Sequence, residues 1–583
     1  MSEKKGLGYI PAVDGLRAFA VIAVLLYHLG FSWIPGGFLG VDLFFVISGY
    51  VITRLILDSI QRSDGLDLRA FYFARVKRLW PPLIFMIIVT VLFVGIWAPD
   101  TIKRLLTDAP FSILGAINWW LVNRHQDYFE AIGRPPLLQH TWSLAVEVQF
   151  YLIWPLILLL ILKLFGKRII PLASLLIAAT SGVALLLLSF QLDSQGESGV
   201  SHIYFGTDTH SIGLFLGAAL AVSWIPQNFE LQVNKRAQDF IDGVGVFGFV
   251  GMLVLFIYMD ENNPTIYRLA FPLAGLFGCA ILMSVVHPAS RFAPFLTSRL
   301  MLWIGERSYA IYLWHWIVFQ VTRPSVDLAG AEWALIALRI LIVFGLSEIS
   351  LRFVELPIRS GQVGNWFRGL KYQLPRQRRR NKLIVIGSVC ALLISTTLIS
   401  AHAISISEKN IAEIKKELTS TDVVITTVED PTQGLWVAGD SVILGIRHEL
   451  GNRMDIGLIN ARVGRQAREL IEVLRADKIR MKDAAIIFDL GNNNRLQESE
   501  VVDIFEIIKD QKQIIVVNTA VPRGWRDENN DLINRISQNY ANVRIVDWKS
   551  ISQDHPEYFG PDGVHLVPAG ILVYVDAIIS ELK

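Results

Sequence analysis

Residues 11–28 read PAVDGLRAFAVIAVLLYH, an apolar run of nearly the length that a helix needs to cross a bilayer. Many similar runs follow it, so it predicts a transmembrane helix and not a signal peptide that is removed. The run contains Arg17 and His28, although a charge inside a bilayer costs roughly 2.5–3.5 kcal/mol. Eleven residues make three helical turns plus about 20°, so the two side chains share one face about 16 Å apart, with His28 nearer the membrane middle.

The composition also favours a membrane protein. Of 583 residues, 52% are hydrophobic and 18% are charged, whereas soluble chains have about 25% charged residues. The net charge of +2 excludes no class of partner by its total. The two cysteines, Cys279 and Cys390, both lie in apolar runs, so an exported part of the chain would have no disulfide. This absence weakly favours a Gram-positive envelope.

The hydropathy pattern predicts eleven spans, near residues 15–31, 37–57, 81–98, 140–162, 169–190, 209–226, 240–259, 268–287, 306–323, 333–353 and 383–404. Five loops are rich in Lys and Arg and should be cytoplasmic, namely 54–80, 163–168, 227–239, 288–304 and 354–382. Cytoplasmic and external loops alternate along the chain only if the short apolar segment 109–123 does not cross the membrane. We therefore predict that 109–123 is re-entrant or interfacial on the outer side, with a cytoplasmic N-terminus and an external C-terminal domain.

The chain divides into three parts. Residues 1–360 form a predicted helical membrane domain of ten spans. Residues 361–433 hold a basic cytoplasmic loop, an eleventh span that exports the C-terminus, and a linker. Residues 434–583 alternate strand-like runs such as AAIIFDLG and IIVVNTAV with helical stretches. That alternation is typical of a soluble α/β domain.

Several other predicted spans contain ionisable residues, namely Asp42, Glu147, His315 and Glu348. A transport protein can carry such residues too. The basic residues Arg75, Lys77 and Arg78 either bind phosphates or simply hold their loop in the cytoplasm. Arg17 and His28 are either functional or purely structural. In the structural alternative Arg17 extends to the cytoplasmic interface and His28 is hydrogen-bonded in a core pocket.

Five motifs in the first 360 residues resemble the acyltransferase-3 family of bacterial membrane acyltransferases. They are PAVDGLRAFAVIAVLLYH with Asp14, Arg17 and His28, GGFLGVDLFFVISGYVIT with Asp42, Ser48 and Gly49, FYFARVKRLWPP with Arg75 and Arg78, TWSLAVEVQFYLIWP with Trp142, Ser143 and Glu147, and YLWHW with His315. The resemblance implies a cytoplasmic acetyl-CoA donor, a catalytic pair of Arg17 and His28, and a basic loop that holds the phosphates of the coenzyme. Val148 departs from the family, which usually has a second acidic residue beside the equivalent of Glu147.

The C-terminal part contains four short motifs in a fixed order. Ser441 follows the strand-like run LWVAG in the sequence GDS and precedes a helical stretch, where a nucleophile would be exposed near a helix N-terminus. The later motifs are Asn460 with Gly464, the run Gly491-Asn492-Asn493-Asn494, and Asp562 with His565. A GDS sequence alone can be a turn with a helix cap. Asp562 and His565, three residues apart, can supply a general base and the carboxylate that orients it.

These four motifs resemble the SGNH/GDSL hydrolases, whose fold is a three-layer, flavodoxin-like α/β domain. The resemblance implies that Ser441 is the nucleophile, His565 its base and Asp562 the orienting carboxylate. It also implies an oxyanion hole made of the Ser441 N–H, the Gly464 N–H and the Asn493 side chain. Asn494 replaces the usual aspartate of the third motif, and Asp440 is expected to stabilise the turn.

The two parts together are similar to the Gram-positive peptidoglycan O-acetyltransferases, which acetylate the C6 hydroxyl of N-acetylmuramic acid and confer lysozyme resistance. The resemblance implies a plasma-membrane enzyme that takes acetyl from acetyl-CoA and passes it through Ser441 to an envelope glycan. The expected partners are acetyl-CoA, the glycan and membrane lipid, with no nucleic acid, no metal and no bound cofactor. Acetylation of lipopolysaccharide or exopolysaccharide is an alternative. A transporter of an acyl carrier fused to an acetylesterase is another.

Overall fold

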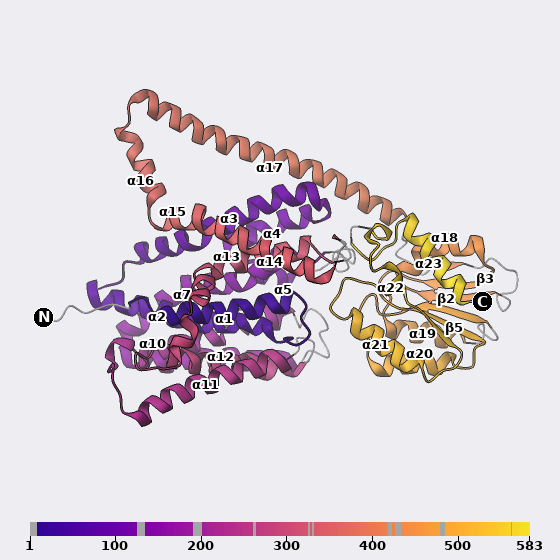
Figure 1. Ribbon diagram of the computed structural model, residues 1–583, viewed down its shortest axis with the longest axis horizontal. Helices are drawn as coiled ribbons and strands as arrows, with labels where there is room; N and C mark the ends of the chain where they lie inside the picture. Colours follow the sequence, from indigo (N-terminus) through magenta and orange to yellow (C-terminus); the bar gives the residue numbers. More distant parts are fainter. Residues whose placement is uncertain are drawn as a thin grey trace.

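The computed structural model describes residues 8–582 apart from 64, 125–133, 191–200, 260–263, 325–326, 329–330, 418–422, 426–433, 479–483 and 561. A helical bundle and an α/β domain lie end to end (Figure 1). The bundle contains α1 (Pro11–His28), α2 (Gly40–Ser63), α3 (Leu68–Trp97), α4 (Ile102–Leu114), α5 (Ile117–Asn123), α7 (Trp142–Phe165), α8 (Ile170–Phe190), α10 (Ile212–Ser223), α11 (Lys235–Tyr258), α12 (Pro264–Val286), α13 (Arg299–Val321), α14 (Glu332–Ile349) and α15 (Leu356–Arg359).

In the described part of the chain, nine helical segments are long and apolar enough to cross a membrane. They correspond to nine of the eleven predicted spans. The other two are α10, whose 12 residues extend about 18 Å, and α13, which has 23 residues but carries Arg299, Glu306 and Arg307. The protein is therefore a multi-pass membrane protein, and the count of eleven spans stays a prediction.

The segment predicted not to cross forms parts of two short helices. α4 has 13 residues and α5 has seven, and Gly115 separates them in the left-handed conformation with φ of 68°. Each helix is shorter than the roughly 20 residues that a span requires. This geometry agrees with an interfacial or re-entrant segment.

The structure corrects the predicted loop 54–80. α2 continues to Ser63, and α3 begins at Leu68 because the Asp67 side chain accepts a hydrogen bond from the Ala70 N–H (2.9 Å). Arg75 and Arg78 therefore lie on a helix, and Arg54 is buried in α2, where it pairs with Asp58. The prediction started the span at residue 81 because the charged first turns of α3 carry no apolar signal.

A second correction concerns the end of the first helix. The predicted span continues to residue 31, but α1 ends at His28, and Gly30 has a positive φ of 87° that a helix does not allow. His28 thus lies at the last turn of α1.

Glycines bring the helices around the first motifs into close contact. A Cβ atom on Gly49 of α2 would lie 1.9 Å from the carbonyl oxygen of Leu214 in α10. A Cβ atom on Gly305 of α13 would lie 2.0 Å from the carbonyl oxygen of Asp14 in α1. Small residues allow membrane helices to approach in this way, and here they fix α1 against α13.

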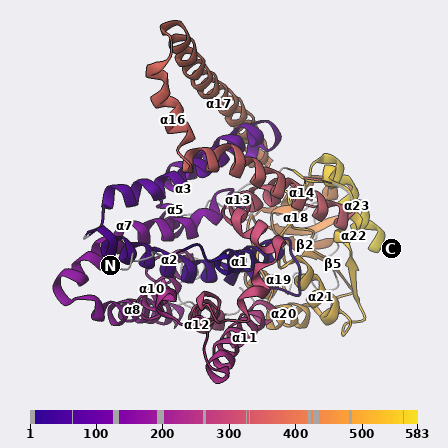
Figure 2. The ribbon, with the colours of Figure 1, turned by 60° about the vertical axis from the view of Figure 1, so that its left-hand side comes forward.

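The helix α17 (Pro375–Glu417) connects the two parts. Its 43 residues extend about 65 Å, so the last basic residues of the predicted loop and the start of the predicted linker are helical. In both views α16 (Gln362–Gly369) and the first half of α17 stand away from the bundle (Figures 1 and 2).

The C-terminal domain is a six-stranded sheet in the order β1-β3-β2-β4-β5-β6. Its strands are β1 (Val423–Ile425), β2 (Leu435–Gly439), β3 (Ile456–Ala461), β4 (Ala485–Asp489), β5 (Gln513–Val517) and β6 (Val543–Val546). The last five strands are parallel, and β1 is an antiparallel edge strand that starts before the predicted boundary at residue 434. Taken in chain order, the parallel strands have the flavodoxin-like order 2-1-3-4-5.

Helices cover both faces of this sheet. The first face packs against α18 (Ser441–Arg453) and α23 (Pro568–Glu581), and the second against α19 (Ala467–Asp477), α20 (Glu498–Ile508) and α21 (Arg526–Ser537). The short helix α22 (Trp548–Ser552) lies beside the first face. Ligands of such sheets bind where the strand order reverses, which is between β2 and β4 here. Ser441 follows β2 and Asn493 follows β4, so the fold brings these two motifs to one place.

Candidate active sites

The membrane half contains a cavity of about 80 Å³ between α1, α2, α3, α7 and α13. Its polar lining comes from Arg17, Ser48, Arg75, Arg78, Ser143, Glu147, Tyr151, Ser308, Tyr309 and Tyr312. The structure thus brings together four of the predicted residues, Arg17, Arg75, Arg78 and Glu147. Asp14 joins them indirectly, because its carboxylate accepts a hydrogen bond from the Arg17 guanidinium (2.8 Å).

Glu147 is held by two hydroxyl groups. Ser48 Oγ donates to its Oε1 (2.8 Å), and the Tyr151 hydroxyl donates to its Oε2 (2.9 Å). Val148, which stands where the family usually has a second acid, is buried and packs over Gly115. An acidic side chain at that position would have to lie in an apolar site. The cavity therefore uses one carboxylate, oriented by Ser48 and Tyr151.

Three histidines gather beyond the end of this cavity. His315 Nε2 lies 3.2 Å from His28 Nδ1, and the His140 and His315 rings are 5.8 Å apart. Tyr312 links the two places, because it lines the cavity and its ring lies 5.3 Å from that of His315. Arg17 and His28 therefore belong to neighbouring sites and not to one pocket.

Asp42 lies apart from both places. It is buried, and its Oδ1 is 3.1 Å from His210 Nε2. The His210 ring packs on Phe271 with a centroid distance of 3.9 Å. Sequence reasoning missed His210 and His140. The rule that a charge within a span needs a partner could have prompted a search for His210.

Glu348, the remaining ionisable residue of the predicted spans, pairs with arginines. Its carboxylate accepts a hydrogen bond from Arg307 Nε (2.5 Å) and pairs with Arg352. These contacts give Glu348 a role in joining α13 and α14, outside the cavity.

In the outer domain, Ser441 is the first residue of α18, directly after β2. Asp440 caps this helix, since its Oδ1 accepts a hydrogen bond from the Val442 N–H (2.8 Å). The cap fixes the turn that presents Ser441 at the helix N-terminus, where backbone N–H groups stabilise negative charge. Asp440 thus has the turn-stabilising geometry that the sequence predicts.

The loop before α23 joins Asp562 to His565. Asp562 Oδ2 lies 2.6 Å from His565 Nδ1, and its Oδ1 accepts hydrogen bonds from the Val564 and His565 N–H groups (2.9 and 3.0 Å). Burial lowers the pKa of His565, but the hydrogen bond and charge of Asp562 and the charge of Asp440 outweigh it, so the pKa is raised. Val442, which follows Ser441, and Val564, which precedes His565, line the same small pocket, so the fold brings the His565 loop close to the nucleophile turn.

Of the predicted oxyanion residues, Asn493 contacts this turn, and Gly464 precedes Arg465, which donates to the Gly439 carbonyl oxygen (3.3 Å). Gly464 has a φ of 77°, a conformation that favours glycine. Asn493 Nδ2 donates to Asp440 Oδ2 (2.6 Å) and to the Arg465 carbonyl oxygen (3.1 Å). Asn493 can therefore donate to an oxyanion only by sharing or releasing one of these bonds.

Two further motif asparagines, Asn460 and Asn494, have local partners. Arg465 donates to the Asn460 side-chain oxygen (2.8 Å) and to its carbonyl oxygen (2.5 Å). Asn494 Nδ2 donates to the Arg495 carbonyl oxygen (3.2 Å). Both residues shape the loops around the site.

Sequence reasoning missed Asp489, the last residue of β4. Its Oδ1 accepts a hydrogen bond from the Asp440 N–H (3.1 Å), and its Oδ2 accepts one from Asn492 Nδ2 (3.2 Å). Burial and the charge of Asp440 raise the pKa of Asp489 well above its usual range. The raised pKa favours the neutral form of Asp489, and its hydrogen bond from the Asp440 N–H supports the nucleophile turn.

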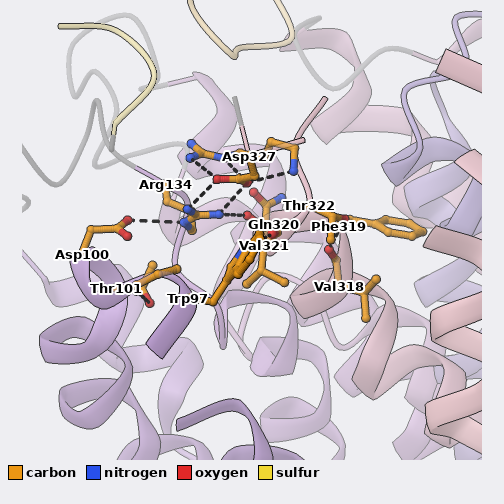
Figure 3. A network of polar contacts seen from close by, with 12 residues as sticks. Trp97, Asp100, Thr101, Arg134, Val318, Phe319, Gln320, Val321, Thr322 and Asp327 are labelled. Atoms are coloured by element: carbon orange, nitrogen blue, oxygen red, sulfur yellow. Dashed lines mark hydrogen bonds and ion pairs between the residues drawn. The ribbon is translucent and has the colours of Figure 1, made fainter. Parts of the chain in front are cut away.

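A network of charges lies at the end of the bundle that faces the outer domain (Figure 3). Arg134 donates to both carboxylate oxygens of Asp327 (2.8 Å each), and Arg323 also donates to Asp327 (3.0 Å). Arg134 also pairs with Asp100 (3.4 Å). The network ties together three connections of the bundle, and a segment of the outer domain passes above it in Figure 3.

The pKa of Arg523 in the outer domain responds to charges of both halves of the molecule. Burial and the charges of Arg323 and Arg104 in the membrane half lower the pKa of Arg523 to about 10, against the opposing charge of Asp562. Arg523 is thus within electrostatic range of Asp562 on one side and of the membrane half on the other.

Comparison with known proteins identifies the family. Residues 10–348, more than half of the chain, match the family described as an acyltransferase domain. The chain is 33% identical to the peptidoglycan O-acetyltransferase OatA of Listeria monocytogenes, over 99% of this chain and 98% of that protein. It is 32% identical to the O-acetyltransferase OatA of Staphylococcus aureus, over 99% of this chain and 96% of that protein. The chain therefore belongs to this acyltransferase family, and it is an O-acetyltransferase with a multi-pass membrane domain.

Proposed function

We propose that this protein moves acetyl groups from cytoplasmic acetyl-CoA to hydroxyl groups of peptidoglycan, with the C6 hydroxyl of N-acetylmuramic acid as the acceptor. The observation that carries the proposal is the presence of two sites in one chain. One is the arginine-lined cavity of the membrane half, and the other is the Ser441 site of the outer domain. Coenzyme A does not cross a membrane, and the glycan lies outside, so a transfer between them needs a site on each side.

The cavity suits an anionic thioester donor. Arg17, Arg75 and Arg78 offer three guanidinium groups, which bind phosphate oxygens through charged hydrogen bonds. Glu147 and the tyrosines of the lining supply polar contacts for the rest of the donor. The cavity reaches Tyr312, next to the histidines, so the acyl end of a donor would point toward His28.

The outer site suits an acetyl-enzyme. In the proposed SGNH-type reaction, His565 takes the Ser441 proton as the hydroxyl oxygen bonds to the acetyl carbonyl carbon, and the leaving group departs with that proton. A sugar hydroxyl then attacks the acetyl-serine, gives its proton to His565, and leaves with the acetyl group. The names of the two relatives support acetyl as the group, and that of the Listeria protein supports peptidoglycan as the acceptor.

The proposal is tested by mass spectrometry of muropeptides from cells with and without the gene. Cells that make the protein should contain O-acetylated N-acetylmuramic acid, and cells without it should lack that modification. A decrease of acetylation on expression would instead identify an esterase.

We expect the orientation to follow the charge rule, with loop 354–382 in the cytoplasm and residues 434–583 outside. A reporter that is active only outside the membrane should work when fused after residue 583. A cysteine-specific, membrane-impermeant reagent should label a cysteine placed in the outer domain, in a background with Cys279 and Cys390 replaced. A C-terminal reporter that is active only in the cytoplasm would contradict the relay.

We expect the hydrolysis of a small acetyl ester by the full chain in detergent to decrease at acidic pH, with an apparent pKa above 6.5. His565 must be neutral to accept a proton, and its raised pKa means that the neutral form is lost at a higher pH than for an ordinary histidine. The measurement is kcat/KM between about pH 5 and pH 9.

The Asp562→Asn variant is the control for this pH profile. Its rate should fall by about 10⁴-fold, because the imidazole loses its orienting carboxylate. The acid limb should move to lower pH, since burial alone lowers the pKa of His565. A limb that lies below pH 6.5 in the unchanged protein, or one that Asp562→Asn leaves in place, would contradict this role of Asp562.

A further inference from the structure

The hydrogen bonds of His315 determine which of its nitrogens carries a hydrogen. His315 Nδ1 lies 2.6 Å from the Tyr312 carbonyl oxygen. A carbonyl oxygen can only accept, so Nδ1 is the N–H nitrogen. None of the hydrogen bonds of His315 within the described part of the chain involves a carboxylate, and an unpaired cation in the apolar interior is costly. His315 is therefore neutral, and its Nε2 is an acceptor.

This assignment fixes the tautomer of His28 in turn. His28 Nδ1 lies 3.2 Å from His315 Nε2 and 2.9 Å from the Val24 carbonyl oxygen. Both of these atoms are acceptors, so His28 Nδ1 must carry the hydrogen and share it between them. His28 Nε2 is then the nitrogen with the free electron pair.

The position of His28 Nε2 agrees with a reactive role. It has no hydrogen-bond partner among the residues that the structure describes, and it is not one of the unpaired polar atoms that are sealed from solvent. The Trp316 ring packs against the His28 ring with centroids 5.0 Å apart, and its Nε1 donates to the Pro136 carbonyl oxygen (2.8 Å). The ring of His28 is therefore held on one side while Nε2 stays accessible.

We propose that His315 is a positioning residue that holds His28 in the tautomer whose Nε2 accepts a proton during acetyl transfer in the membrane half. The inference rests on the proposed function and assigns the atoms of its first step. His28 Nε2 takes the proton of a hydroxyl group in the membrane half, the first acetyl acceptor, as that hydroxyl oxygen bonds to the thioester carbonyl carbon. The carbon–sulfur bond then breaks, and the proton passes from Nε2 to the sulfur, which leaves as a thiol.

The hydrogen bonds from His28 to His315 and Val24 stabilise the positive charge that His28 gains when it accepts a proton, and no permanently charged residue is needed. When Nε2 accepts a proton, the His28 Nδ1–H becomes a charged donor, and charged donors make stronger hydrogen bonds to His315 and Val24. In a serine protease a carboxylate fills the place that His315 has here. The neutral imidazole of His315, which donates to the Tyr312 carbonyl oxygen, stabilises a charged His28 less than a carboxylate would. It also places no permanent negative charge inside the bilayer.

The tautomer can be measured without any substrate. In the full chain labelled with ¹⁵N-histidine and reconstituted in lipid, the His28 signals are those that disappear in His28→Gln. Nitrogen chemical shifts distinguish a protonated from an unprotonated ring nitrogen, and we expect His28 to show a protonated Nδ1 and an unprotonated Nε2. In His315→Leu we expect a mixture of both tautomers. The opposite tautomer in the unchanged protein, or no change in His315→Leu, would overturn the proposal whether or not acetyl transfer occurs.

The kinetic consequence is measured as thiol release from acetyl-CoA by the full chain. His315→Leu should lower kcat by roughly 10²-fold or more, the size of a general-base contribution, while KM for acetyl-CoA changes less than about twofold. His315→Gln should keep at least about a tenth of the rate, because its amide can donate to Tyr312 and accept from His28. His402→Gln, at an exposed position on α17, is the matched control and should not change the rate.

Two kinetic results would overturn the positioning role. One is a His315→Leu protein as active as the unchanged one, and the other is equal loss in His315→Gln and His315→Leu with a raised KM, which indicates a merely structural residue. No thiol release by the unchanged protein would contradict the proposed function, and the nitrogen spectra would then decide the tautomer separately.

Discussion

Replacing Ser441 with alanine should lower the hydrolysis of a small acetyl ester by about 10⁴-fold or more and stop glycan acetylation in cells. Ser441 lies at the N-terminus of α18 with Asp562 and His565 beside it, and the acetyl-enzyme cannot form without its hydroxyl. The measurements are the rate of ester cleavage by the full chain in detergent and the acetylation of muropeptides. Normal folding is checked by the thermal unfolding of the outer domain.

Asp440→Ala is the matched comparison for this prediction. It removes the cap of α18, worth about 1 kcal/mol, and one partner of Asn493, but it leaves the nucleophile and base in place. We therefore expect a smaller loss of rate than in Ser441→Ala. Equal and complete loss in both variants would show that Asp440 takes part in the chemistry.

Replacing His28 with alanine should stop glycan acetylation in cells and leave ester hydrolysis by the outer site unchanged. His28 lies at the end of α1 beside His315, whereas Ser441 lies in a separate domain with its own sheet and core. Neither residue can perform the chemistry of the other, so the two sites act in series. Ser441→Ala should stop acetylation as well, and it should allow an acylated form of the membrane half to accumulate.

Loss of a membrane histidine can also disturb insertion, so the His28→Ala protein is compared with His402→Ala at equal expression. His402 is exposed on α17, outside both sites, and its variant should acetylate normally. Normal acetylation by a well-expressed His28→Ala protein would remove α1 from the mechanism. It would favour an outer esterase fused to a transporter.

Local patterns predicted much of the membrane half. Apolar runs located most of the helices, because the bilayer requires a long stretch without charge. The same criterion misplaced the start of α3, whose first turns carry Arg75 and Arg78, and it treated the buried Arg54 as a loop residue. Partners distant in the chain could not be predicted, since the contact of Asp42 with His210 depends on how α2 packs against the start of α10, and that of His28 with His315 on how α1 packs against α13.

The outer domain was more predictable around its site than at its edges. A strand followed by GDS and a helix predicted the placement of Ser441, and three-residue spacing predicted the contact of Asp562 with His565. The first strand, β1, was not predicted because its three residues are too few to show the alternation of apolar and polar residues that marks a strand. Asp489 was missed because an acid at the end of a strand has no signature, and only the fold places it beneath Asp440.

Transfer of acetyl between the two sites is tested most directly by reconstituting the full chain in sealed vesicles and adding labelled acetyl-CoA to the face that carries loop 354–382. After rapid quenching, mass spectrometry of the peptide that contains Ser441 measures the label. The relay predicts acetyl-Ser441 in the unchanged protein and none in His28→Ala, although an added acetyl ester labels Ser441 in both. Equal labelling of Ser441 from acetyl-CoA in both proteins, or none in an unchanged protein whose Ser441 reacts with the ester, would contradict it.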